Sequence, residues 1–140
     1  MMTRIDDGVW GARALSLLRI VAALIFLLHG STKLLGFPAS DMPMPPAMSL
    51  MWLGGLLELV GGLMLLLGIL SRPVAFILSG EMAVAYWMFH APNSTFPSAN
   101  GGDAAILYCF VFLLIAAAGP GPWSVDHSLT RRRASTKQDA

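Results

Sequence analysis

The chain has 140 residues, of which 56% are hydrophobic and only 12% are charged, and its mean hydropathy is +0.67. A soluble domain usually carries about 25% charged residues, because its surface must be hydrated. The composition therefore argues against a cytosolic enzyme, a nucleic-acid binder and a disordered regulator, and it indicates a polytopic membrane protein. The single cysteine, Cys109, cannot form an intramolecular disulfide.

Four apolar runs follow a short polar N-terminal segment, and they predict helices at about 14–36, 48–70, 72–90 and 102–119. A helix of about 20 residues crosses the hydrocarbon core of a bilayer. Short connections make consecutive helices antiparallel neighbours. The sequence thus predicts an all-α fold, a transmembrane up-down four-helix bundle in one domain over residues 1–126, followed by a basic, flexible tail at 127–140.

The segments between the runs support these boundaries. Residues 36–46 are rich in proline, which cannot continue a helix. Pro73 suits the first turn of the third helix, and Asp103 stands where the fourth helix would have its N-cap. The fourth helix should end at the Gly119–Pro122 segment.

The basic residues predict the orientation of the bundle. The side that holds both termini and the 71–72 turn carries seven of them: Arg4, Arg13, Arg72, Arg131, Arg132, Arg133 and Lys137. The opposite side has only Lys33. The protein is expected in a bacterial inner (plasma) membrane. Because basic residues remain on the cytoplasmic side of such a membrane, both termini are expected in the cytoplasm. The Arg131–Arg133 cluster is interpreted as a lipid-headgroup anchor, and no nucleic-acid partner is expected.

Ionisable side chains inside the apolar runs are the most informative residues. Each costs about 2.5–3.5 kcal/mol at the centre of a membrane helix. Glu58 and Glu81 lie near the middle of the second and third runs, while the first run contains Arg19, His29 and Lys33. By depth, Glu58 can meet His29 or Lys33, and the long side chain of Arg19 can reach Glu81.

Glycines flank Glu58 at one-turn spacing, which lets a neighbouring helix approach its carboxylate closely. We therefore expect the two carboxylates and the basic groups to face one interior cavity. Two interpretations remain open. The groups either form buried ion pairs that only fix helix packing, or they line a binding site for a polar small molecule or a quinone headgroup.

Other polar residues give weaker predictions. Asp103 would close the outer mouth of the cavity if it has a role beyond capping. His29 and His90 differ in depth, which argues against a bis-histidine haem. No motif typical of a phosphate loop, a nucleophile elbow or a metal site is present.

The chain resembles the DoxX family of small four-helix membrane proteins. The features that carry the resemblance are Arg19, His29-Gly-Ser-Thr-Lys33, Gly55-Leu-Leu-Glu58-Leu-Val-Gly61-Gly62, Arg72-Pro-Val-Ala, Gly80-Glu81-Met-Ala, Asn100-Gly-Gly-Asp103 and Gly119-Pro-Gly-Pro-Trp-Ser-Val-Asp126. They extend over about residues 16–126. One departure is Asp103, where the family pattern often has Glu, and this leaves the charge unchanged.

The resemblance implies a link to membrane redox systems. The family is named after a small subunit associated with a quinol oxidase or a thiosulfate:quinone oxidoreductase, and many relatives carry an oxidoreductase label. Other relatives are linked to quinone or thiol stress, and distant ones behave as assembly factors. The sequence contains no ligand set of the usual kind for flavin, haem, copper or an iron–sulfur cluster, so electrons would have to pass through a partner subunit or a bound quinone.

We therefore predict an accessory protein of a quinone-linked respiratory or detoxification system, at most a subunit of a quinone-linked oxidoreductase. Its expected partners are the lipid bilayer and redox subunits or further copies of the chain. The binding candidates are Arg19, His29, Lys33, Glu58, Glu81 and Asp103. Lys33 and Arg19 would hold charge, and His29 or a carboxylate would exchange protons with the headgroup. The alternatives are a non-catalytic scaffold or assembly factor for membrane proteins and a small transporter.

Overall fold

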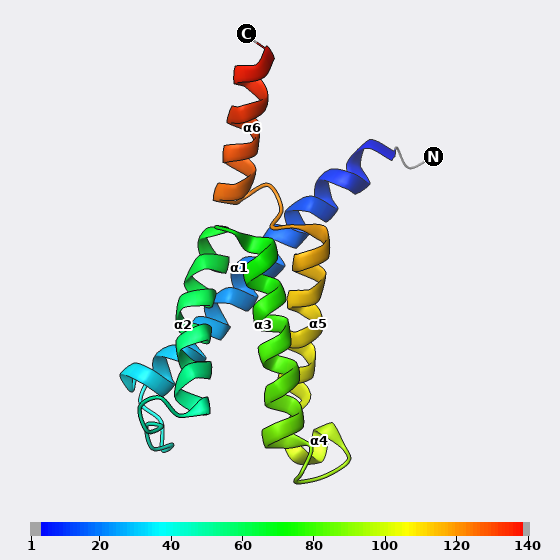
Figure 1. Cartoon of the computed structure of the whole chain (residues 1–140). Helices are drawn as coiled ribbons and strands as arrows, with labels where there is room; N and C mark the ends of the chain where they lie inside the picture. Colours follow the sequence, from blue (N-terminus) through cyan, green and yellow to red (C-terminus); the bar gives the residue numbers. More distant parts are fainter. Residues whose placement is uncertain (1–3, 139–140) are drawn as a thin grey trace.

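The computed structural model describes residues 4–138, with side chains described over 8–136. Residues 1–3 and 139–140, which belong to the predicted terminal segments, lie outside the described residues, as do the side chains of Arg4 and Lys137. The described chain is helical without strands, which confirms the all-α prediction (Figure 1). Its elements are α1 (Arg4–Leu35), α2 (Leu50–Leu67), α3 (Ser71–Ala85), the π-helical turn η1 (Tyr86–His90), α4 (Pro97–Asn100), α5 (Asp103–Ala118) and α6 (Val125–Gln138).

Several helix boundaries differ from the predicted ones. Helix α1 begins at Arg4 and not near residue 14, because helical hydrogen bonding continues beyond the apolar run that marked the expected start. Helix α2 ends at Leu67 because Gly68 adopts the left-handed conformation (φ 72°, ψ 45°) and its N–H closes the last turn. Asp103 is the first residue of α5 and Gly102 is its N-cap, one position earlier than predicted. Helix α6 lies in the segment where a flexible tail was predicted.

The main helices are arranged in two packed pairs. Helix α1 packs along α2, α3 packs along α5, and α1 runs diagonally across the bundle (Figure 1). Phe26 and Phe112 connect the pairs at the core, with ring centroids 4.8 Å apart in an edge-to-face arrangement. The beginning of α1, the α2–α3 turn and α6 all lie at one end of the molecule (Figure 1). We call this the basic end, because α6 carries Arg131, Arg132 and Arg133.

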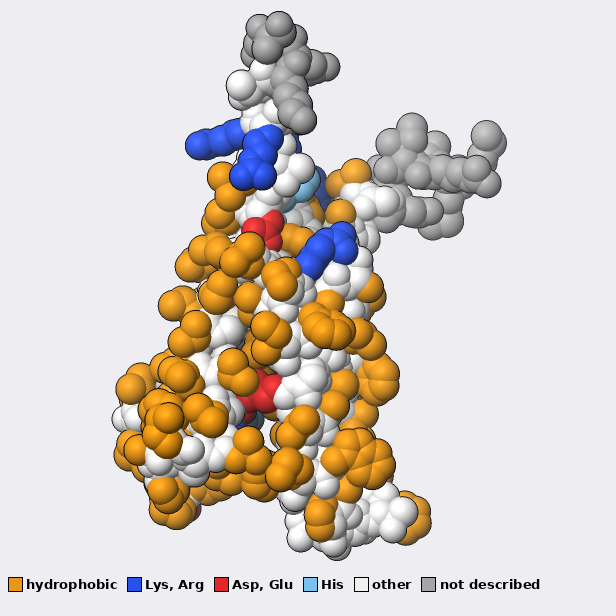
Figure 2. Space-filling model, viewed as in Figure 1, with side chains coloured by type: hydrophobic (Ala, Val, Ile, Leu, Met, Phe, Trp, Pro, Cys, Tyr) orange, Lys and Arg blue, Asp and Glu red, His pale blue; other side chains and the backbone are white. Residues whose placement is uncertain are grey.

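The outer surface of the helices is apolar. Large hydrophobic side chains are exposed along α1, α2, α3 and α5, and they cover most of the face shown in Figure 2. Two helices, at Gly8–Leu35 and Leu50–Leu67, are long and apolar enough to cross a membrane, whereas the apolar helix Asp103–Ala118 is shorter. Such a surface is typical of contact with lipid. That all four main helices span the membrane as an up-down bundle stays a prediction.

Charged side chains at the basic end close the ends of helices. The carboxylate of Asp126 accepts hydrogen bonds from the backbone N–H groups of Leu70 (2.9 Å) and Ser71 (2.8 Å), at the beginning of α3. Arg72 donates to the carbonyl oxygens of Ala116 (3.1 Å) and Ala117 (2.6 Å), at the end of α5. Each charge is placed where it compensates the dipole of the helix end that it contacts.

Candidate functional site

Glycines bring α1 and α2 into close contact. A Cβ atom at Gly30 would lie 2.5 Å from the backbone nitrogen of Leu59 and 2.8 Å from the carbonyl oxygen of Gly55. A Cβ atom at Gly62 would lie 3.1 Å from the backbone of Leu27. Only residues without a side chain allow this separation of the two helices. The close approach of the two helices places Lys33, one turn after Gly30, beside Glu58 of α2.

Lys33 and Glu58 form an ion pair across this interface. The Lys33 Nζ atom lies 2.6 Å from Glu58 Oε1, and the exposed fractions of the two side chains are 24% and 3%. The contact confirms that Glu58 meets a base of α1, and of the two predicted bases it is Lys33. The second carboxylate oxygen, Oε2, is buried and has no hydrogen-bond partner among the described residues.

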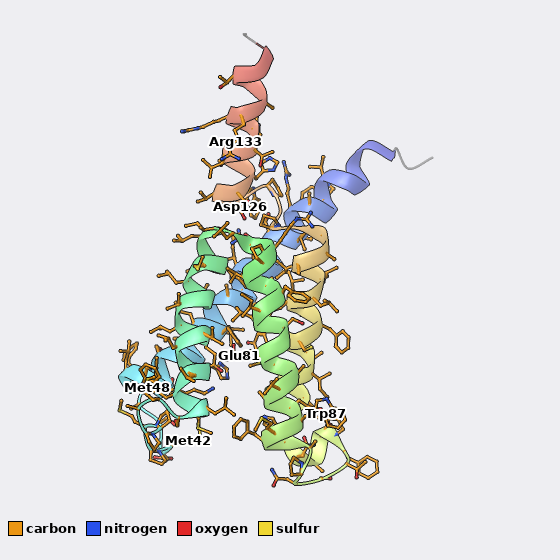
Figure 3. All side chains as sticks on the ribbon, in the orientation of Figure 1. Met42, Met48, Glu81, Trp87, Asp126 and Arg133 are labelled. Atoms are coloured by element: carbon orange, nitrogen blue, oxygen red, sulfur yellow. The ribbon has the colours of Figure 1, made fainter. Side chains whose placement is uncertain are left out.

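Glu81 approaches the same place from α3. Its Oε1 atom lies 3.2 Å from the position that a Cβ atom would occupy at Gly54, one turn before Glu58. Its carboxylate is close enough to interact electrostatically with both Glu58 and Lys33. The Oε2 atom of Glu81, like that of Glu58, is buried without a partner among the described residues. Figure 3 shows Glu81 between α3 and α2, where Figure 2 shows acidic atoms within the apolar face.

We call Lys33, Glu58 and Glu81 the acidic triad. The triad contains one ammonium group, which is paired with Glu58, and two carboxylates, each with an oxygen that accepts no hydrogen bond from the described part of the chain. An unpartnered buried acceptor costs about 1–3 kcal/mol. The arrangement can therefore accept hydrogen bonds from a further donor group or hold a proton. Whether it binds a ligand stays a prediction.

Arg19 is not part of the acidic triad, and the expected pairing with Glu81 is wrong. Its side chain is wholly buried and donates hydrogen bonds to four carbonyl oxygens, those of Leu65, Leu66, Pro120 and Trp123. Two of these carbonyls belong to the last turn of α2, and two belong to the segment that follows α5. Arg19 therefore joins the end of α2 to the chain that leads into α6. The sequence could not indicate this, because a carbonyl partner can belong to any residue type.

His29 and Asp103 also lie apart from the acidic triad. His29 is exposed, its Nδ1 atom is 2.9 Å from the carbonyl oxygen of Ile25, and its ring faces Tyr108 of α5 at 6.3 Å between centroids. The expected single cavity with both His29 and Lys33 is therefore wrong. Asp103 is exposed at the beginning of α5. Within residues 8–136 its carboxylate forms neither a hydrogen bond nor an ion pair.

Two residues have structural roles that the sequence did not indicate: Tyr108 was not singled out, and Asp126 was named only as part of a motif that carries the family resemblance. Tyr108 stacks on Phe112 (5.6 Å) and lies beside His29, and its hydroxyl-bearing ring within an apolar run was an available signal. Asp126 caps α3 from a segment 55 residues further along the chain. No local pattern predicts such a long-range cap.

Comparisons with known proteins agree with this description. The DoxX family model matches residues 14–91, more than half of the chain. A Haemophilus influenzae protein, described only as uncharacterized, is 41% identical over 123 residues, which cover 84% of this chain and 92% of the relative. The Escherichia coli inner membrane protein YqjF is 29% identical over 118 residues, which cover 81% of this chain and 90% of that protein. No solved structure matches the chain.

The matched segment contains α2, α3, most of α1 and all three residues of the acidic triad. The extent of the family match, the near-complete coverage of the relatives and the lipid-facing apolar surface lead to one conclusion. This chain is a membrane protein of the DoxX family.

Proposed function

We propose that the acidic triad binds the headgroup of a small quinol-like amphiphile from the lipid phase. In this proposal the protein is an accessory component of a bacterial inner-membrane redox or detoxification system. The inner-membrane location is supported by the printed name of the Escherichia coli relative. Cytoplasmic termini are supported by the arginines at the basic end.

The observation that carries the proposal is the pair of unpartnered carboxylate oxygens. Glu58 Oε2 and Glu81 Oε2 come from different helices; Glu58 is paired with Lys33, and Glu81 lies against Gly54, one turn before Glu58. In a hydrocarbon environment such acceptors require a donor. A headgroup with two hydroxyl groups, as in a quinol, offers donors to both carboxylates at once.

The charges of the acidic triad also favour the reduced form of the ligand. A quinol donates hydrogen bonds through its hydroxyl groups, whereas an oxidised quinone presents only carbonyl acceptors. In the triad with both carboxylates ionised, Lys33 is the one residue that could donate to such a carbonyl, and one of its three N–H groups is already directed at Glu58. We therefore expect binding of the quinol to exceed binding of the quinone. A bound quinol would supply the electrons and protons for transfer to a partner, and the triad would hold and orient its headgroup.

The surroundings of Glu81 suit a ligand that arrives through lipid. The adjacent Gly80 has open space where a side chain would be, and large apolar residues of α2 and α3 are exposed to either side. The acidic atoms are visible from outside within this apolar face (Figure 2). An amphiphile could place its headgroup against the carboxylate and leave its tail along the helices.

The test measures retention of a short-chain quinol and of the corresponding quinone by the protein in lipid nanodiscs under anaerobic conditions. The variants are Glu81→Gln and Glu58→Gln, with Asp103→Asn as the matched control for an exposed acid. Loss of a charged acceptor changes a hydrogen bond worth roughly 1.5–3 kcal/mol, so quinol affinity should fall about tenfold or more. Asp103→Asn should bind like the wild type.

Two results would overturn the proposal. One is a wild-type protein that retains no more quinol than empty nanodiscs do. The other is equal retention by the wild type and by both triad variants. Thermal unfolding of each variant shows whether it has kept the fold, so that a loss of binding can be assigned to the site.

A further inference from the structure

Methionines are concentrated at the end of the molecule opposite the basic end. The chain contains nine methionines, and five of them lie in the loop after α1, at the beginning of α2, or in η1: Met42, Met44, Met48, Met51 and Met88. All five are exposed, with fractions between 44% and 73%. Figure 3 shows Met42 and Met48 in the loop beside the beginning of α2.

Three of these methionines share one groove. Met44 from the loop, Met51 from the first turn of α2 and Met88 from η1 all line a hollow of about 460 Å³. Three prolines and Ser49 contribute to its walls, and none of the lining residues is charged. The three methionines thus line one hollow although they come from segments that are far apart in the sequence. The sequence alone predicted no metal site, and this grouping is visible only in the fold.

The backbone around Met44 is restricted. Pro43, Pro45 and Pro46 surround it, and proline fixes φ near −65°. The N–H of Ser49 donates to the carbonyl of Pro46 (3.1 Å), and the Ser49 hydroxyl accepts from the N–H of Trp52 (3.2 Å), so the loop is joined directly to the first turn of α2. Both features fix the loop that carries Met44 against the beginning of α2, which carries Met51.

The chemistry of the thioether distinguishes methionine from the leucine that covers most of the surface. Both side chains pack well against apolar neighbours, but only methionine offers a soft, polarizable sulfur ligand. Soft thioether ligands select Cu(I) over divalent cations that prefer oxygen or imidazole ligands. A neutral trio of thioethers with no carboxylate or imidazole in the groove matches a monovalent soft cation.

We propose that Met44, Met51 and Met88 form a binding site for one Cu(I) ion. The site shares no residue with the acidic triad and lies in a groove that neither Lys33, Glu58 nor Glu81 lines. Ag(I), which has the same charge and preference for sulfur, should occupy the same site.

The test is a competition between the detergent-solubilised full chain and a colorimetric Cu(I) chelator under reducing, anaerobic conditions. We expect one Cu(I) per chain. Each of Met44→Leu, Met51→Leu and Met88→Leu should weaken binding by about tenfold, and the triple variant should lose it. Leucine keeps the apolar volume, so the fold should be retained, as checked by thermal unfolding.

Matched controls use sulfur atoms outside the groove. Met64→Leu, near the other end of α2, and Cys109→Ala, in α5, should leave Cu(I) affinity unchanged. The proposal is overturned if the wild type does not compete for Cu(I), if the triple variant binds as the wild type does, or if Cys109→Ala removes the binding. X-ray absorption of the Cu(I) complex should show sulfur ligands, and a shell of nitrogen and oxygen alone would equally overturn it.

Discussion

Lys33 Nζ lies 2.6 Å from Glu58 Oε1, and this contact joins α1 to α2 at the point where Gly30 lies against the α2 backbone. The ion pair and the close helix packing therefore depend on each other. Lys33 can reach Glu58 because the glycine permits the approach, and the approach is compatible with an apolar surrounding because the buried carboxylate has a counterion.

Removal of the Lys33 charge should destabilise the protein. In Lys33→Met the Glu58 carboxylate stays buried and loses its charged donor, so the free energy of unfolding should fall by about 2 kcal/mol. The double variant Lys33→Met with Glu58→Leu should recover most of this loss, because no buried charge remains. A double-mutant cycle by thermal unfolding in detergent measures both effects, and an equally unstable double variant would contradict the expected coupling.

Gly30 should tolerate no side chain. A Cβ atom there would lie 2.5 Å from the Leu59 nitrogen, so Gly30→Ala should force the helices apart and lower the unfolding free energy by about 1–3 kcal/mol. Gly11→Ala is the matched control on the same helix, because nothing lies within 4 Å of its added Cβ atom. That control should be neutral or slightly stabilising, since alanine favours the helix. Equal effects of the two substitutions would argue against the close packing.

Arg19 should act on stability and not on ligand binding. Arg19→Met leaves the carbonyl groups at the end of α2 and in the 120–123 segment without their donor, so the unfolding free energy should fall by about 3 kcal/mol. Arg19→Lys should restore only part of it, because an ammonium lacks the planar fork of donors. Limited proteolysis of the segment that follows Gly119 measures locally whether this segment has been loosened. If Arg19→Met is as resistant as the wild type, the proposed role of Arg19 is wrong.

Asp126 should stabilise the beginning of α3. Asp126→Ala removes the acceptor for the N–H groups of Leu70 and Ser71, and the loss of such a cap costs about 1 kcal/mol. Asp41→Ala, in an exposed loop, is the control and should change little. Hydrogen exchange of the first turn of α3 reports the effect directly. Unchanged protection in Asp126→Ala would contradict it.

The structural features that were predicted well from the sequence depend on composition and on the depth of a residue within its apolar run. The apolar runs predicted the helices, and depth predicted that Glu58 would meet His29 or Lys33, of which the structure shows Lys33. His29 was misplaced because α1 also faces α5, where Tyr108 lies beside the imidazole. Arg19 was misplaced because its acceptors are backbone carbonyls, which leave no mark in a sequence.

The central claim is that Glu58 and Glu81 accept hydrogen bonds from one bound headgroup. Difference infrared spectroscopy in the carboxyl region, with and without a short-chain quinol, tests this most directly. The account predicts ligand-induced carboxylate bands that decrease in both Glu58→Gln and Glu81→Gln and persist in Asp103→Asn. Carboxylate bands that do not respond to the quinol, or that respond equally in all these variants, would contradict it.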